Sequence, residues 1–600
     1  MGGSMTYAAG TAAALGAAWV VAAIRQRLES RRRLGELRER VAAKLASRAA
    51  QRAEFKAWAA ANGELVPSAE ERARLVRLSA CELVAELRSG KTSAVSAVVT
   101  ACLRAIECGK KYDSNADEMF MAAVARAKEA DLKRARGEEL GALHGLPITV
   151  KDNVDVCGAD TTVGMMVRAG VPATADAAVV ETLVRAGAIP FCKSNVPQLL
   201  MLPESMNRVW GRAKNPWNAA RTPGGSSGGE AVLVATGASW CGIGTDIGGS
   251  IRIPAHYCGI VGFKPTPERM SSVGSRGSSK VGSSGQQAIR GVAGPMTRCV
   301  ADAEMLQRLW FAEGSAMHAR DPYAPPLTWR EPAPNSPERS SARRVGLVLD
   351  DGWFEVAPAN RRATLEAAAA LEAAGYVVVP FTAPDPHEFV RLYAAIMSAD
   401  GALRNLAGGL DAEPVVDEYK ELLWIASLGA GPRALIARLL RAAGEHRKAF
   451  FLGSGGQTEV IDYYQLVVEL GKYRQLFAAA FKAERLDCVL LPGGTLPALP
   501  HGHSAKLAVV QSLNFMWNAL HWPCGTVPVT LTRQDECVWP GKQDSLDVLA
   551  QAALTGAEGM PVGVQVATLP WQDELCLSIM KDVEKGVCFD TNHQRPFLKE

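Results

Sequence analysis

Two glycine-serine clusters and one lysine constrain this chain more than any other feature of its sequence. The clusters are residues 224–229, Gly-Gly-Ser-Ser-Gly-Gly, and residues 244–252, which contain Gly248-Gly249-Ser250. Lys151 follows an apolar run, residues 146–150, that predicts a buried strand. Glycines allow backbone N–H groups to converge on one point, while a serine and a lysine supply a nucleophile and a base. The pattern favours an acyl-transfer site that works without histidine.

Composition and periodicity indicate one large α/β domain. The 600 residues are 48% apolar, enough for a sizeable core, and the net charge of +4 gives no reason to expect a nucleic-acid partner. Ala80–Leu87 and Ser93–Ile106 are amphipathic and predict helices, whereas Ala188–Phe191 predicts a second buried strand. Apolar runs that alternate with helices in this way are typical of layered α/β folds.

The cysteines indicate free thiols rather than a metal site. Thirteen are scattered from Cys81 to Cys588 without a Cys-x-x-Cys pair, and no cluster of ligands has metal-binding spacing. A dispersed set of this kind is typical of a reducing compartment. We therefore predict no metal and a catalytic domain in the cytosol.

The N-terminus predicts a membrane anchor. Residues 5–24 carry no charge, and a helix of twenty residues spans about 30 Å, the thickness of a bilayer core. Arginines follow this segment and none precedes it, which places the C-terminal side in the cytosol. Nine of the twenty residues are alanine, so a buried or surface helix is the alternative. We expect a transmembrane segment over 1–27, a helical stalk over 28–74 and a catalytic domain over 75–600.

A basic amphipathic helix is predicted from Arg433 to Ala443. Three arginines lie on one side of its helical wheel, and four aliphatic residues lie opposite (Leu435, Ile436, Leu439 and Leu440). Such a helix suits an anionic membrane surface, and the alternative is a surface helix whose leucines pack on the core.

The first cluster also matches Gly-x-Ser-x-Gly, centred on Ser226 and again on Ser227. That motif marks an α/β-hydrolase elbow, which needs a preceding strand and a downstream acid and histidine. Residues 219–223 make a poor strand, and the histidines after residue 500 have no recognisable setting. We therefore reject the elbow.

Residues 145–266 resemble the signature region of the amidase signature family. Further similar motifs are Asn215-Pro216-Trp217, Val489–Pro492, Gly559–Gln565 and, resembling the fatty-acid amide hydrolases of animals, Leu569–Leu577. The resemblance implies an α/β amidase signature fold, with a large mixed, twisted sheet covered by helices on both faces. It also implies amide hydrolysis without a cofactor.

The resemblance assigns each catalytic role to a residue of this chain. Lys151 is the base, Ser226 bridges it to the nucleophile Ser250, and the Gly225–Ser226 peptide bond is cis. The oxyanion hole comprises the amides of Ile247, Gly248, Gly249 and Ser250. From the residues themselves, we expect Ser227 to support this network and Arg252 to orient the loop by pairing with a carboxylate such as Asp246.

The same resemblance suggests the substrate. It maps the acyl pocket onto Leu200 and Met201 and onto residues 513–522, and a membrane-binding cap onto residues 421–452. Two departures bear on specificity: Leu200-Met201 stands where many relatives have Met-Phe, and Asp152 stands where a glutamate often follows the lysine. The expected protein is a homodimeric, membrane-anchored hydrolase of lipid amides on an endoplasmic-reticulum-type membrane. The alternatives are an amidase of small or aromatic amides and a non-catalytic scaffold.

Overall fold

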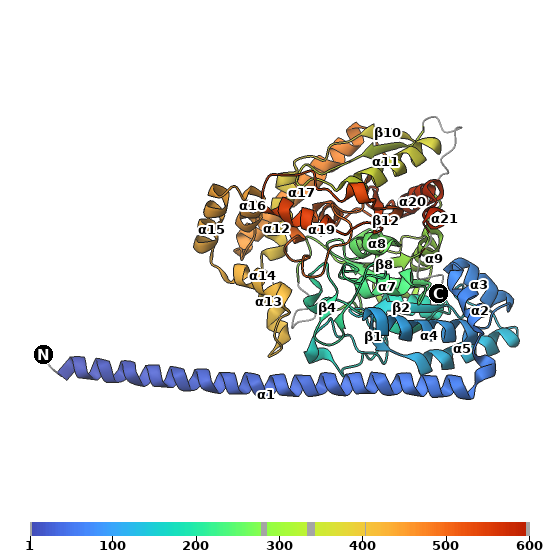
Figure 1. Cartoon of the computed structure of the whole chain (residues 1–600), viewed down its shortest axis with the longest axis horizontal. Coiled ribbons are helices and arrows are strands. Elements are labelled where there is room, and N and C mark those ends of the chain that lie inside the picture. Colours follow the sequence, from blue (N-terminus) through green and yellow to red (C-terminus); the bar gives the residue numbers. More distant parts are fainter. Residues whose placement is uncertain (1–2, 278–284, 333–341, 402–403, 594, 596–600) are drawn as a thin grey trace.

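The computed structural model describes residues 3–277, 285–332, 342–401, 404–593 and 595, with side chains omitted for 3–18 and 404–405. An 11-stranded sheet forms its centre (Figure 1), in the order β1-β3-β2-β6-β8-β7-β12-β13-β11-β9-β10. The strands are β1 (Asn115–Glu118), β2 (Pro147–Lys151), β3 (Ile189–Ser194), β6 (Cys241–Asp246), β7 (Val261–Lys264), β8 (Val292–Thr297), β9 (Arg344–Leu347), β10 (Val377–Pro380), β11 (Cys488–Pro492), β12 (Cys524–Leu531) and β13 (Pro561–Ala567). β4 (Met206–Asn207) and β5 (Gly211–Arg212) form a separate pair.

Helices cover both faces of this sheet, as predicted (Figure 1). They are α1 (Gly3–Ala61), α2 (Ala69–Arg77), α3 (Ala80–Ser89), α4 (Ala94–Tyr112), α5 (Phe120–Ala135), α6 (Ala178–Arg185), α7 (Gly228–Ala235), α8 (Arg252–Cys258), α9 (Val300–Trp310), α10 (Ala316–Arg320), α11 (Pro358–Ala373), α12 (Pro386–Ser398), α13 (Arg404–Ala407), α14 (Asp417–Ser427), α15 (Ala430–Ala442), α16 (His446–Ser454), α17 (Val460–Ala483), α18 (Ser512–Ala519), α19 (Ser545–Leu554), α20 (Asp573–Val587) and α21 (Phe589–Asn592). The helices predicted at 80–87 and 93–106 are α3 and α4, and the two predicted strands are β2 and β3.

Strand alternation separates an apolar face of the sheet from the face that carries the polar site. On β13, Val562, Val564 and Val566 pack in one core cluster with residues of α9, α11 and α20. Gln565 points the other way, where Arg252 of α8 donates to its Oε1 at 2.8 Å. Because side chains alternate along a strand, one continuous apolar face leaves the opposite face free for polar groups.

The mixed topology brings the ends of two neighbouring strands together. β2 is parallel to both β3 and β6, whereas β6 is antiparallel to β8. Lys151 ends β2 and Asp246 ends β6, so both reach the same edge of the sheet. Crevices outside the carboxyl ends of parallel strands commonly hold binding sites.

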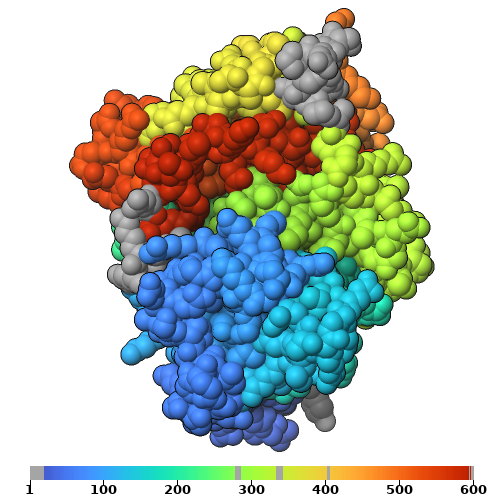
Figure 2. Space-filling model, turned by 90° about the vertical axis from the view of Figure 1, so that its right-hand side faces the viewer, coloured from blue at the N-terminus to red at the C-terminus, as the bar shows by residue number. Residues whose placement is uncertain are grey.

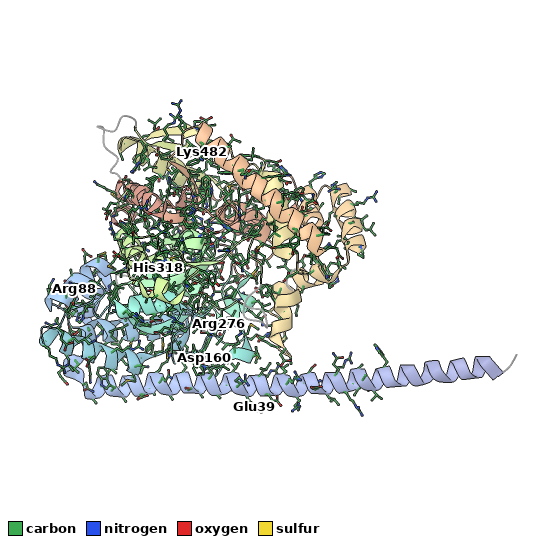
Figure 3. All side chains as sticks on the ribbon, turned by 180° about the vertical axis from the view of Figure 1, so that it is seen from behind. Glu39, Arg88, Asp160, Arg276, His318 and Lys482 are labelled. Carbon is green, nitrogen blue, oxygen red and sulfur yellow. The ribbon has the colours of Figure 1, made fainter. Side chains whose placement is uncertain are left out.

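The second half of α1 packs along the body through a basic stripe. Lys44, Arg48 and Arg52 are four residues apart and so share one helix face. Lys44 pairs with Asp117 at 2.6 Å and with Asp160 at 3.1 Å, and Figure 3 shows Asp160 beside the helix. Arg48 donates to the carbonyl oxygens of residues 115 and 116, and Arg52 binds Glu118 with two hydrogen bonds. The helix therefore covers the edge strand β1.

The predicted span at residues 5–24 falls within α1, a helix of 59 residues that continues into the predicted stalk, residues 28–74, and ends at Ala61. Most of that span, residues 5–18, lies outside the residues whose side chains the structure describes, and residues 1–2 lie outside it altogether. Across the described part of the chain, no single helix is both long and apolar enough to cross a bilayer. Taken together, the helices α14 and α15 are long and apolar enough to cross a bilayer, but the pair is bent by 111°.

The predicted cap, residues 421–452, comprises the end of α14 together with α15 and most of α16. Three of its large apolar side chains, Trp424, Leu435 and Leu439, are each more than half exposed, and in α15 only Ala437 is buried. Phe450 and Phe451 instead pack against the core. Figure 1 shows these helices on the same side of the body as the free N-terminal part of α1. On the face shown in Figure 2, residues from near the N-terminus (blue) lie below residues from near the C-terminus (red).

Candidate active site

Lys151 is fully buried and is hydrogen-bonded to Ser226, the serine predicted to bridge it to the nucleophile. Its Nζ lies 2.7 Å from Ser226 Oγ, 2.9 Å from Thr245 Oγ1 and 3.1 Å from the Thr245 carbonyl oxygen. Burial lowers the pKa of Lys151 to about 7, although the Asp246 and Glu230 carboxylates oppose this shift. A lysine with this pKa is neutral in a large fraction of molecules near pH 7 and can then accept a proton from Ser226.

The glycines around Ser226 leave room for close backbone contacts. A methyl group on Gly229 would lie 2.3 Å from the Asn195 nitrogen, and one on Gly225 would lie 2.5 Å from the Leu202 carbonyl oxygen. The Gly225–Ser226 peptide bond is cis, as the resemblance implies. No strand leads into this segment, since residues 213–223 form neither a helix nor a strand longer than a single bridge. An elbow of the α/β-hydrolase type is therefore absent from this described stretch.

Ser250 lies on the loop between β6 and α8 and is directly joined to the first cluster. The backbone N–H of Ser227 donates to the Ser250 carbonyl oxygen at 3.1 Å, and Ser227 Oγ lies 3.4 Å from the Thr245 carbonyl oxygen. Two segments and the end of β2 thus meet at one place, and they carry the predicted base, bridge and nucleophile. Ser250 is 9% exposed, so its side chain is mostly enclosed by protein.

The predicted oxyanion loop offers three unoccupied amides rather than four. Gly249 adopts a φ of +95°, and its N–H donates to Asp246 Oδ1 at 2.8 Å. Among the residues that the structure describes, none accepts a hydrogen bond from the N–H of Ile247, Gly248 or Ser250. Preorganised N–H groups of this kind stabilise the oxyanion of acyl transfer.

Arg252 holds this loop through the ion pair expected with Asp246. Both side chains are fully buried, and Arg252 Nη2 lies 3.0 Å from Asp246 Oδ1. Arg252 also donates to Asn518 Oδ1 at 2.7 Å and to Gln565 Oε1 at 2.8 Å. Burial alone would raise the pKa of Asp246, but the charge and hydrogen bonds of Arg252 outweigh it and hold that pKa below its usual range. Asp246 is therefore ionised, and its oxygens also fix the amides of Gly249 and Ile251.

One predicted wall of the acyl pocket lies against the oxyanion loop, and the other packs against α14. Phe515 of α18, within the predicted range 513–522, would lie 3.4 Å from a methyl group on Gly248. Leu200 and Met201 pack with Tyr419 of α14 in one apolar cluster. The Tyr419 hydroxyl donates to the Gln198 carbonyl oxygen at 2.6 Å and accepts from the Met201 amide at 3.0 Å. The pocket segment is thereby connected to the bent helix pair.

Comparison with known proteins identifies the family. Residues 97–577 match the family model described as Amidase. The chain belongs to the amidase signature family. It is 36% identical to fatty-acid amide hydrolase 1 of Sus scrofa over 517 residues, 85% of this chain and 86% of the relative. It is 34% identical to fatty acid amide hydrolase 1 of Caenorhabditis elegans over 457 residues, 74% and 77% of the two chains.

A solved structure of a fatty acid amide hydrolase has the same fold. It superposes with a TM-score of 0.75 and covers 86% of both chains at 24% sequence identity. Together with the sequence relatives, this establishes that the protein is an amide-hydrolysing enzyme of the amidase signature family.

Two polar groups of this amidase site were not predicted from the sequence. Thr245 supplies two of the three partners of Lys151 Nζ. Glu230 of α7 is buried beside Thr149, to which it is hydrogen-bonded, and a methyl group on Gly242 would overlap its carboxylate. Burial raises the pKa of Glu230 to about 7, so this carboxyl group is partly protonated at neutral pH. The one signal that could have indicated Glu230 is its place directly after Gly228-Gly229.

A buried amide–carboxylate pair fixes the pocket segment of the amidase. Gln198 Nε2 donates to Glu413 Oε1 at 2.6 Å, the Met166 amide donates to Glu413 Oε2 at 2.6 Å, and the Val416 amide donates to Gln198 Oε1 at 2.8 Å. Leu199 and Leu200 both have a φ of +63°, which is unfavourable for leucine. These hydrogen bonds hold the two leucines in that conformation.

Exchanging the two partners tests this arrangement. Glu413→Gln always leaves two N–H groups facing each other, so we expect it to lower the free energy of unfolding by about 1–3 kcal/mol. Gln198→Glu brings two carboxylates together and should destabilise as well. The double exchange, Gln198→Glu with Glu413→Gln, restores a donor opposite each acceptor within the pair and at the Met166 and Val416 amides. Only the longer contact of Gln198 Nε2 with the Pro414 carbonyl oxygen, at 3.3 Å, is lost. Urea denaturation at about pH 8, where Glu413 with its pKa of about 7 is mostly ionised, should show the double variant more stable than either single variant. A double variant whose loss in free energy of unfolding equals the sum of the two single losses would contradict the hydrogen bond between Gln198 and Glu413.

Proposed function

We propose that this amidase cleaves fatty acid amides, both fatty acid ethanolamides and primary fatty amides, to a free fatty acid and an amine. The observation that carries the proposal is the fully buried Lys151, whose Nζ lies 2.7 Å from Ser226 Oγ. The identity with animal fatty-acid amide hydrolases over most of the chain supports the substrate class.

The proposed reaction runs through an acyl-enzyme on Ser250. Neutral Lys151 accepts the proton of Ser226, and Ser226 accepts the proton of Ser250 as that oxygen bonds to the amide carbonyl carbon. The carbonyl oxygen becomes an oxyanion, which the free amides of the loop stabilise. When the C–N bond breaks, the proton held by Lys151 passes to the leaving amine.

Water completes the cycle. It attacks the acyl carbon and gives its proton to the same relay, and the C–O bond to Ser250 breaks. The products are the fatty acid and the regenerated serine hydroxyl. The triad thus returns to its starting protonation state without a cofactor.

We extend the proposal to the membrane. The bent pair α14–α15 exposes Trp424, Leu435 and Leu439, and α1 exposes Trp19 and Ile24 at its free end. Exposed apolar side chains of this kind bury favourably in a bilayer interface. We propose a single-pass anchor over residues 1–27 in an endoplasmic-reticulum-type membrane, with the catalytic domain in the cytosol, and a homodimer by analogy with the family.

The experiment that tests the function compares two substrates on detergent-extracted protein. We expect oleoyl ethanolamide to be hydrolysed with a much higher kcat/KM than a short-chain amide, and Ser250→Ala to abolish both activities. Equal or faster turnover of the short amide would agree with the proposed catalytic site but refute the assignment of lipid amides as substrates. Activity that survives in Ser250→Ala would show that the nucleophile is a different residue.

A further inference from the structure

The hydroxyl of Tyr393 lies against the oxyanion loop without a hydrogen-bond partner. Tyr393 belongs to α12, and a methyl group on Gly248 would lie 2.5 Å from its hydroxyl oxygen. The residue is 9% exposed. No described residue accepts from this hydroxyl or donates to it. The ring is therefore mostly enclosed, whereas the hydroxyl oxygen is not fully buried and is available to a bound substrate.

Other buried tyrosines of this region are satisfied. Tyr473 of α17 donates to the Pro384 carbonyl oxygen at 2.6 Å, and Tyr419 donates to the Gln198 carbonyl oxygen at 2.6 Å. Tyr393 differs from them in facing the loop that carries the nucleophile.

The Tyr393 ring is held rigidly in place. It stacks on Phe515 with ring centroids 4.4 Å apart and an angle of 5° between the planes, and it also packs near Phe389. Burial raises the pKa of Tyr393, so the phenol stays protonated and remains a donor at any pH where the enzyme works. A donor that is already oriented loses little entropy when it binds a developing charge.

The loop itself lacks one of the four amides that the family resemblance assigns to it. The Gly249 N–H is bound to Asp246, and three amides remain free. An additional donor beside Gly248 would supplement them. From this geometry we infer that Tyr393 is a further catalytic residue, which donates a hydrogen bond to the substrate carbonyl oxygen as it becomes an oxyanion. The inference rests on the proposed acyl-enzyme reaction at Ser250.

The substitution Tyr393→Phe tests the inference because it removes one oxygen and keeps the ring stack. We expect kcat/KM for amide hydrolysis to fall by about 10²-fold, mostly through kcat, as for other oxyanion donors. A trifluoromethyl ketone with an oleoyl chain forms a stable oxyanion when Ser250 adds to its carbonyl carbon. The affinity of Tyr393→Phe for this ketone should be lower than that of the wild type by a similar factor. The affinity for oleyl alcohol, which has the same chain but neither a carbonyl nor a carboxylate group, should stay within about twofold.

Tyr473→Phe is the matched control. It deletes a hydroxyl from the same apolar cluster, but one that has a partner remote from Ser250. We expect this variant to keep its kcat/KM and to unfold at lower urea concentration, because the partly buried Pro384 carbonyl group loses its donor. Tyr393→Phe should show the opposite combination, with stability kept or increased and turnover lost.

The possible outcomes separate this inference from the proposed function. If Ser250→Ala is inactive and Tyr393→Phe retains kcat/KM and ketone affinity within about threefold, the role of Tyr393 is refuted and the triad stands. A rise in KM with unchanged kcat would also refute it, since it would indicate ground-state binding. Activity in Ser250→Ala would refute the proposed function first. The test can use either the oleoyl or the short amide, because the donor acts on the carbonyl group common to both.

Discussion

Replacing Lys151 with alanine is expected to lower kcat/KM for amide hydrolysis by about 10²–10⁴-fold, the usual contribution of a general acid–base group. The same lysine receives the proton from the serines and returns it to the amine. Ester hydrolysis should fall less than amide hydrolysis, because an alkoxide leaves more readily than an amide anion. Both substrates should be measured on the same preparation.

The pH dependence of kcat/KM should also be set by Lys151. Lys151 must be neutral to act as base, and burial lowers its pKa to about 7. Wild-type kcat/KM should therefore rise tenfold per pH unit below that value and level off above it. In Lys151→Ala the rise should disappear. A variant that keeps the wild-type profile from about pH 5 to about pH 9 would show that another group is the base.

Replacing Arg252 with methionine is expected to destabilise the fold by about 3–5 kcal/mol, because it leaves the Asp246 carboxylate buried and unpaired. Asp246 fixes the amides of Gly249 and Ile251, so the oxyanion loop should lose its shape and activity should fall with stability. Urea denaturation followed by fluorescence measures the first effect, and kcat/KM at a temperature where the variant is folded measures the second.

Two comparisons control for a general effect of losing an arginine. Arg32 forms an exposed pair with Glu36, and Arg32→Met should leave stability unchanged, because exposed ion pairs contribute little. Adding Asp246→Asn to Arg252→Met removes the unpaired charge and should recover part of the lost stability. An Arg252→Met variant as stable as Arg32→Met would contradict the role of the buried pair.

The strands and helices near the catalytic residues could be predicted because their signals are local. The apolar run before Lys151 is β2, and the glycines of both clusters mark places where a side chain would collide with neighbouring backbone. Local spacing also indicated that Arg252 would meet Asp246, six residues away.

The remaining contacts join segments that are far apart in the sequence, and no local pattern could show them. Arg252 meets Asn518 and Gln565 across 266 and 313 residues, and Gln198 meets Glu413 across 215 residues. Such pairs depend on which strands become neighbours in the sheet. Tyr393 gave no sequence signal because α12 meets the oxyanion loop and Phe515 of α18 only through long-range packing.

The seating of α1 decides how much of the N-terminus can be removed without harm. From Arg33 onward the helix bonds to the body, and Leu37, Val41 and Phe55 are buried against it. The arginine Arg48 supplies donors to the carbonyl groups of β1, an edge that would otherwise be open to pairing with another chain. A shortened protein meant for crystallisation should therefore begin ahead of Arg33. Removing all of α1 would expose the edge strand β1, which could then pair with another chain and cause aggregation.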